Sequence, residues 1–149
     1  MTDPPVLRPA PPDTDLAGEY FAWHSRGELR FQRCSTCRAW IHPPRRLCPD
    51  CGTATLEWEA SAGRGVLFSW TRTHYGFSPD FDATEPYLCA VVELDEGPRI
   101  LTSLVEADQV ELAIGLPVTL AFEPRRGDTA VAVFRVAPGP GAGSPTASG

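Results

Sequence analysis

Residues 34–51 read CSTCRAWIHPPRRLCPDC and contain two C-x-x-C pairs separated by ten residues. Two such pairs can fold as two knuckles that bring four sulfur atoms to one metal ion. Thiolates arranged as a tetrahedron favour zinc, and a complete set of four leaves no open coordination position. We therefore predict one structural Zn²⁺ ion without a catalytic role. Its ligands are Cys34, Cys37, Cys48 and Cys51.

Three other interpretations of these cysteines stay open. An iron centre uses the same four thiolates, so the sequence alone does not separate iron from zinc. Disulfides need an oxidising compartment, but residues 1–16 lack the apolar segment of a signal peptide, which favours a cytoplasmic protein with reduced thiols. A redox C-x-x-C motif usually stands alone beside a βαβ pattern, which we do not find in this sequence.

The residues around the two pairs suit a small ribbon at 28–60. Pro49 stiffens the second knuckle, and Gly52 follows it where the chain often takes a positive φ. Arg38 stands at the matching position of the first knuckle, which departs from this pattern. The predicted strands of the ribbon are 28–32, 40–42 and 55–59.

Composition limits the remaining architecture. A chain of 149 residues with 42% hydrophobic residues has room for one domain plus a small metal-stabilised module. No apolar run approaches the roughly 18 residues of a membrane helix. The Pro- and Gly-rich ends, 1–13 and 138–149, are predicted to be disordered because they bury too little apolar surface.

Charge is distributed unevenly along the chain. The net charge of −6 argues against a protein that coats nucleic acid. Residues 28–51 nevertheless hold five arginines and two acidic residues, whereas 63–136 hold six arginines and eleven acidic residues. The ribbon is therefore the candidate surface for an anion. Alternatively, its arginines only balance the anionic metal–thiolate centre.

A helix is predicted at 14–27. Leu16, Tyr20 and Trp23 follow the i, i+4, i+7 spacing of one helix face, and Phe21 widens this stripe. Thr14 or Asp15 can cap the start, and Gly27 favours the end. The aromatic stripe is either core or a surface that docks on a partner or ligand.

Residues 61–137 have the pattern of a small β-barrel. Alternating apolar residues and two tight turns predict five strands without an intervening helix, which is typical of an OB-fold. Val66, Phe68 and Trp70 alternate like a core face, and Cys89 is predicted to be a buried small hydrophobe. The five strands are 64–74, 86–94, 98–105, 117–123 and 129–137.

Catalytic machinery is sparse in the sequence. We expect His24 to be exposed on the helix and His42 to pack beside the metal centre. His74, near Asp80 and Asp82, is the one candidate acid–base group, although a histidine at a strand end is usually a surface residue. Nucleophile, phosphate-binding and dinucleotide motifs are missing. The sequence thus favours an accessory or binding protein without catalytic residues.

Several motifs occur in a fixed order along 20–136. In the ribbon they are FQRC-x-x-C at 31–37, HPPR at 42–45 and CP-x-C at 48–51. In the barrel they are G-x-x-x-SWT at 65–71, PY at 86–87, VELDEG at 92–97 and IGLPV at 114–118. This combination resembles the family catalogued as domain of unknown function thirty-five, in which a rubredoxin-like zinc ribbon precedes an OB-fold. Arg38, where glycine is common, and the Pro/Gly-rich tail depart from the family pattern.

The resemblance implies a mainly β protein with an N-terminal helix, a rubredoxin-like zinc ribbon and a five-stranded OB-fold barrel. It also implies a non-catalytic partner of a thiolase-like or hydratase-like enzyme that binds acyl-CoA in lipid or steroid breakdown. Arginine's planar guanidinium suits phosphate. We therefore expect Arg33, Arg45 and Arg46 to hold the CoA phosphates or an acidic partner surface, and Phe21 and Trp23 to face the acyl chain or the partner.

Two rival functions are weighed against this one. Zinc ribbons and OB-folds both bind single-stranded nucleic acid, but that function needs a basic groove with exposed aromatics, and the barrel is acidic. A stand-alone acyl-CoA thioesterase is the other rival, and it would turn over substrate without a partner. We expect neither nucleic-acid nor membrane binding.

Overall fold

A computed structural model describes residues 7–79 and 85–138 of the chain. In this part of the chain, α1 (Asp15–Ser25) precedes an antiparallel sheet of β1 (Arg30–Cys34), β2 (Trp40–Ile41) and β3 (Leu56–Ala60), in the order β2-β1-β3. Five further strands close into a barrel in the order β4-β5-β6-β8-β7. These are β4 (Arg64–Thr73), β5 (Tyr87–Leu94), β6 (Arg99–Val105), β7 (Pro117–Arg125) and β8 (Thr129–Val136). The predicted fold class is confirmed.

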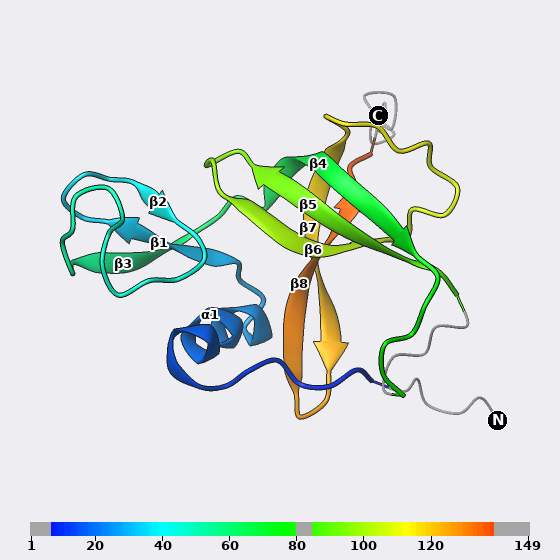
Figure 1. The fold of residues 1–149 in the computed structure, drawn as a ribbon, viewed down its shortest axis with the longest axis horizontal. Coiled ribbons are helices and arrows are strands. Elements are labelled where there is room, and N and C mark those ends of the chain that lie inside the picture. Colours follow the sequence, from blue (N-terminus) through cyan, green and yellow to red (C-terminus); the bar gives the residue numbers. More distant parts are fainter. Residues whose placement is uncertain (1–6, 80–84, 139–149) are drawn as a thin grey trace, which may run out of the picture.

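The small sheet lies to one side of the barrel, and α1 lies beside both (Figure 1). Its central strand, β1, starts two residues later than predicted and runs to Cys34, because Cys34 still pairs with Leu56 of β3. At the end of β1, the N–H of Cys34 donates to the carbonyl of Ala39 over 2.9 Å. The strand pairing therefore places Cys34 at the start of the first knuckle.

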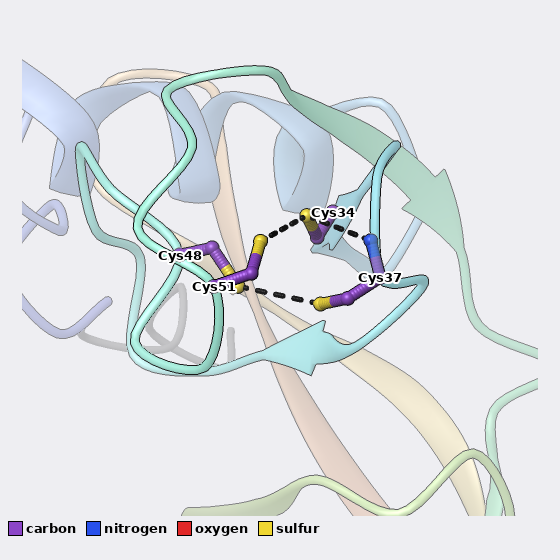
Figure 2. A group of neighbouring side chains, drawn as sticks. All are labelled: Cys34, Cys37, Cys48 and Cys51. Atoms are coloured by element: carbon purple, nitrogen blue, oxygen red, sulfur yellow. Dashed lines mark hydrogen bonds between the residues drawn. The ribbon is translucent and has the colours of Figure 1, made fainter.

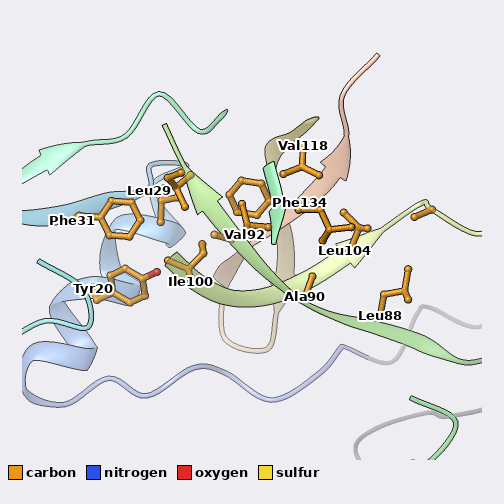
Figure 3. Close-up of a cluster of buried hydrophobic side chains, with 14 residues drawn as sticks. Tyr20, Leu29, Phe31, Leu88, Ala90, Val92, Ile100, Leu104, Val118 and Phe134 are labelled. Carbon is orange, nitrogen blue, oxygen red and sulfur yellow. The ribbon is translucent and has the colours of Figure 1, made fainter. Parts of the chain in front are cut away.

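The barrel closes through two unequal seams. β4 and β7 pair antiparallel around Gly65 and Val118, whereas β6 and β8 pair in parallel only at Leu104–Phe134 and Val105–Arg135. A Cβ atom on Gly65 would lie 2.3 Å from the Glu93 carbonyl oxygen, so the close approach of β5 requires glycine there. The barrel interior is filled by apolar side chains that include Val92, Leu104, Val118 and Phe134 (Figure 3).

The core face of β4 is not the predicted one. Leu67 pairs with buried Val92 and faces the core, so the adjacent Phe68 points outward. The pairing with β5 then shifts between Leu67 and Ser69, and this β-bulge returns Trp70 to the core side. Leu67 is fully buried, while Phe68 is 40% exposed and carries the Arg99 guanidinium 3.9 Å above its ring. The prediction that Phe68 faces the core is therefore wrong. Trp70 is half-buried and packs against the core.

Cys89 is the second correction in the barrel. Along β5 the buried side chains are Leu88, Ala90, Val92 and Leu94. Because side chains alternate between the two faces of a strand, Cys89 points outward, and it is half-buried rather than buried.

The buried face of the helix matches the predicted stripe in part. Tyr20 is buried and Phe21 packs against the core, as predicted, but the second buried residue is His24, the i+4 neighbour of Tyr20, and Trp23 is half-buried. The prediction that His24 is exposed is wrong, since only 2% of this residue is exposed. Its Nδ1 accepts a hydrogen bond from the backbone N–H of Ala132 in β8, over 3.1 Å. Thr14 occupies the N-cap position without a side-chain capping bond.

Leu7 and Arg8, in the segment 1–13 that the sequence predicts to be disordered, contact Arg126 in the turn after β7. Arg126 donates from its backbone N–H to the Arg8 carbonyl over 3.1 Å and from its Nε to the Leu7 carbonyl over 2.9 Å. Arg8 also lies 3.7 Å from a carboxylate oxygen of Glu123. Residues 1–6 and 139–149 lie outside the described residues. Within the described part, no helix has the length and apolarity needed to cross a bilayer.

Candidate metal centre

The four predicted ligands come together in one cluster (Figure 2). Cys34 ends β1 and Cys37 follows in its turn, while Cys48 and Cys51 belong to the long connection between β2 and β3. All four sulfur atoms lie within 4.8 Å of one another. The Cys34–Cys51 and Cys37–Cys48 sulfur pairs are 3.5 and 3.6 Å apart. With Zn–S bonds of about 2.3 Å, a tetrahedral site has sulfur atoms about 3.8 Å apart, so the spacing fits one ion.

The two knuckles share a backbone geometry. Gly52 and Arg38 both have a positive φ, of 77° and 65°. Their N–H groups donate to the carbonyls of Cys48 and Cys34, over 2.9 and 3.0 Å. Arg38 therefore takes the left-handed conformation that glycine takes in the second knuckle, at the cost of a crowded Cβ.

Backbone N–H groups polarise the sulfur of Cys34. The N–H groups of Cys37 and Thr36 each donate to it over 3.4 Å. The Cys37 N–H is the largest cause that lowers the pKa of Cys34 to about 6. The pKa of Cys37 is raised to about 12: the Ala39 N–H lowers it, but partial desolvation of this exposed residue and the neighbouring sulfurs of Cys48 and Cys34 raise it.

Four adjacent thiolates need a compensating cation, which a divalent metal supplies. Cys34 and Cys48 are buried, and Cys37 and Cys51 are exposed. Four sulfur donors complete a tetrahedron and leave no position for a substrate. The donor set therefore fits one structural metal.

The three arginines predicted to bind an anion have different environments. Arg33 is engaged: it lies 3.1 Å from a carboxylate oxygen of Glu59 and 4.5 Å above the ring of Trp40. Arg46 forms an ion pair with Asp15 at the start of α1. Arg45 is exposed, and among the described residues its guanidinium has no hydrogen-bond or ion-pair partner.

The two aromatic residues predicted to face a ligand lie apart. Phe21 is half-buried and lines a cavity beside α1. Trp23 instead lies under two guanidinium groups, those of Arg30 at 4.3 Å and Arg26 at 5.1 Å from the ring centroid. The structure does not bring these aromatics together with the three arginines into one pocket.

Sequence reasoning missed the groups that surround this cavity. His42, expected beside the metal, has its ring contacts with Tyr20 and Phe31, at centroid distances of 5.3 and 5.2 Å. His24 also contacts Tyr20, with a distance of 4.4 Å between the ring centroids. The i, i+4 spacing of Tyr20 and His24 was a signal for their shared face. For Arg125, which also lines the cavity, we find no such signal.

Comparisons with known proteins agree with both modules. Residues 25–57 match the ChsH2 rubredoxin-like zinc ribbon domain, and residues 58–123 match the ChsH2 C-terminal OB-fold domain. A probable enoyl-CoA hydratase alpha subunit of Thermomonospora curvata is 34% identical over 90% of this chain. The matched part is only 41% of that subunit's length.

For two further relatives, the match extends over a larger share of the relative's own length. A DUF35 domain-containing scaffold protein of Methanocaldococcus jannaschii is 31% identical over 64% of this chain and 68% of its own length. A chain of the solved structure of an Ltp2–ChsH2(DUF35) aldolase is 34% identical, with a TM-score of 0.74, over 80% of this chain and 93% of that one. The chain therefore belongs to the ChsH2/DUF35 family, in which a rubredoxin-like zinc ribbon is joined to a C-terminal OB-fold domain.

Proposed function

We propose that this protein is a non-catalytic accessory subunit, stabilised by one structural Zn²⁺ ion, for a thiolase-like or hydratase-like enzyme that acts on acyl-CoA substrates. The observation that carries the proposal is the similarity to a chain of the Ltp2–ChsH2(DUF35) aldolase structure, which extends over 93% of that chain. The similarity to part of a probable enoyl-CoA hydratase alpha subunit supports the same class of partner.

The geometry of the cysteine site supports an accessory role. A closed four-sulfur centre scaffolds the ribbon and offers no coordination position for a reacting group. His74, the candidate acid–base residue, is exposed beyond the end of β4, and its predicted partners Asp80 and Asp82 lie outside the described residues. His24 and His42 are held neutral by burial, which lowers the pKa of each to about 4.

A surface near the metal suits an anionic group of the substrate or partner. Arg45 is exposed on the connection between β2 and β3, and Arg46 beside it is exposed while paired with Asp15. Exposed surface pairs contribute little, so a phosphate can compete for Arg46. In our proposal Arg45 is the principal contact for CoA phosphate or for partner acid groups. Arg33, which lies over the ring of Trp40, is a second contact for the same anionic group. Phe21 and Trp23 face the acyl chain or the partner.

The test is recovery of a partner from the native host, followed by titration of the complex with an acyl-CoA. We expect a thiolase-like or hydratase-like enzyme to co-purify, and its CoA affinity to fall about tenfold in Arg45→Ala/Arg46→Ala, the effect of losing a charge-assisted contact. The matched control is Arg64→Ala/Arg72→Ala, which removes two exposed barrel arginines. Unchanged affinity in the first variant contradicts the arginine assignment, and turnover by the isolated protein contradicts the accessory role.

A further inference from the structure

A cavity of about 510 Å³ opens where the wall of the barrel is weakest. β6 and β8 pair only at Leu104–Phe134 and Val105–Arg135. Toward 100–103 and 131–133 these strands line the cavity, and the Thr102 hydroxyl bridges them by donating to the Ala132 carbonyl over 3.1 Å. Helix α1, beside β8 in Figure 1, and the turn at 42–44 complete the walls.

Most of the cavity wall is apolar. The residues that matter for an apolar ligand are Ala17, Phe21, Ile100, Leu101, Val131 and Val133. The hydroxyl of Tyr20, another wall residue, points toward Ile100 (Figure 3). A concave, mostly apolar site of this volume matches the usual size of a small-molecule pocket.

Three polar atoms on this wall are buried without a hydrogen-bond partner among the described residues. They are Nε2 of His24, Nδ1 of His42 and Nε of Arg125. Buried polar groups in proteins nearly always have a partner, so these three atoms mark where an occupant of the cavity, a ligand atom or an ordered water, would form a hydrogen bond.

Two of these three atoms, Nε2 of His24 and Nε of Arg125, are hydrogen-bond donors, so the complementary ligand atom is an acceptor. Nδ1 of His24 accepts the Ala132 N–H, so in the neutral imidazole the proton sits on Nε2 and is available as a donor. Burial, with a smaller contribution from His42, lowers the pKa of His24 to about 4, which keeps this tautomer neutral near pH 7. Nε of Arg125 is likewise a donor.

The positive charge of Arg125 is already partly neutralised. The guanidinium of Arg125 lies 3.2 Å from a carboxylate oxygen of Glu123, which also faces Arg8. The remaining need is for a hydrogen-bond acceptor on an otherwise apolar molecule, more than for a full negative charge.

We infer that this cavity binds an apolar molecule through a carbonyl oxygen, as in a ketone or an acyl thioester, with Nε2 of His24 as the donor to that oxygen. This inference deepens the proposed function, on which it rests only for the biological source of the ligand. The binding itself is a property of this chain alone.

The test compares ligands of equal chain length on full-length, zinc-loaded protein. The probes are 2-decanone, decane and decanoate. We expect 2-decanone to bind about tenfold more tightly than decane, the typical effect of one buried hydrogen bond. Equal affinity for the two overturns the role of the oxygen. Tighter binding of decanoate overturns the carbonyl assignment in favour of a carboxylate at Arg125.

Cys89 supplies a local probe of where the ligand binds. It lies on the cavity wall, half-buried, and is not one of the four clustered cysteines. We expect 2-decanone at saturation to slow alkylation of Cys89 several-fold, with Cys89→Ser as the blank. Binding without protection of Cys89 overturns the assigned location.

A paired substitution tests the donor. His24→Asn keeps an acceptor near the Nδ1 position for the Ala132 N–H but removes the Nε2 donor. We expect it to lower 2-decanone affinity about tenfold and to leave decane affinity unchanged. His74→Asn, at an exposed histidine, is the matched control. No loss of ketone affinity in His24→Asn overturns the donor assignment.

A second variant keeps the inference testable if His24→Asn folds poorly. Ala17→Trp fills the cavity from an exposed helix position. We expect it to abolish binding of both 2-decanone and decane, and retained binding overturns the site. Failure to recover a partner enzyme would count against the proposed function but not against binding by the isolated chain. Recovery of a partner enzyme without ligand binding by the isolated chain would contradict only the cavity assignment.

Discussion

The zinc ribbon and the barrel are stabilised in different ways. Around the cysteines, the buried apolar cluster contains only Cys34, Ile41 and Cys48, with Ala39 and Leu56 packed against it. The other cluster contains 14 buried side chains, most of them in the barrel (Figure 3). Ordering a residue costs roughly 1–2 kcal/mol of backbone entropy, which so small a cluster does not offset. We therefore expect the ribbon to depend on a bound metal for its stability and the barrel to fold without one.

The two regions are joined at β1. Phe31 in β1 and Leu29 just before it belong to the large cluster, together with Tyr20 of α1, while Cys34 at the other end of β1 belongs to the four-cysteine cluster. One strand therefore links the apolar core to the metal centre. Destabilising one region and measuring the unfolding of the other tests whether the two regions are thermodynamically coupled.

The largest expected effect comes from removing the metal. Chelation, or Cys48→Ser, removes a contribution on the order of 10–16 kcal/mol at neutral pH. We expect amide hydrogen exchange to show lost protection across 34–56 and retained protection in β5 and in β6. Cys89→Ser, outside the cluster, is the control. Loss of protection in the barrel to the same extent would mean that the two regions unfold as one unit.

Truncation of the barrel core is the converse experiment. Phe134 is fully buried, and Phe134→Ala should lower the free energy of unfolding by about 3–5 kcal/mol, through lost burial and a residual cavity. Phe68→Ala, at the exposed neighbour of Leu67, should cost far less. Chemical denaturation measures both, and zinc stoichiometry should stay at one in each variant. Loss of zinc from folded Phe134→Ala would contradict the independence of the two regions.

His24, which holds α1 against β8, gives a smaller, pH-dependent effect. Unfolded His24 binds a proton near pH 6.5, but in the fold its pKa is lowered to about 4. Between these values the unfolded chain binds more protons, so stability that is complete above pH 6.5 falls as the pH drops toward 4. Between pH 7.5 and pH 5 the loss from His24 should be about 2 kcal/mol.

Denaturation of the wild type and of His24→Asn across this range isolates the contribution of His24, because His42 and the cysteine ligands titrate in both proteins. The variant should lose less stability on acidification than the wild type does. Identical slopes in the two proteins would show that His24 is not held neutral by the fold.

The smallest expected effect concerns the first knuckle. Arg38→Gly removes the steric strain of a Cβ atom at φ 65°, which favours the folded state, but increases the conformational entropy of the unfolded chain, which disfavours it. The two effects on the free energy of unfolding therefore oppose each other. We expect a change within about 1 kcal/mol and unchanged zinc affinity, measured by competition with a chromophoric chelator. A large loss of zinc would mean that the contacts of Arg38 with Glu59, 3.7 Å away, hold the knuckle in place.

The metal ligands, the five barrel strands and the helix followed from local sequence because each is a short-range pattern. Two C-x-x-C pairs form knuckles, and apolar alternation marks strands wherever the pleat is regular. Prediction failed where distant segments decide. Leu67 rather than Phe68 faces the barrel core, the bulge after Leu67 returns Trp70 to the core side, and the docking of α1 on β8 buries His24 against Ala132. The cavity lined by His24, His42 and Arg125 exists only because β6 and β8 part, a property of barrel closure that no single segment encodes.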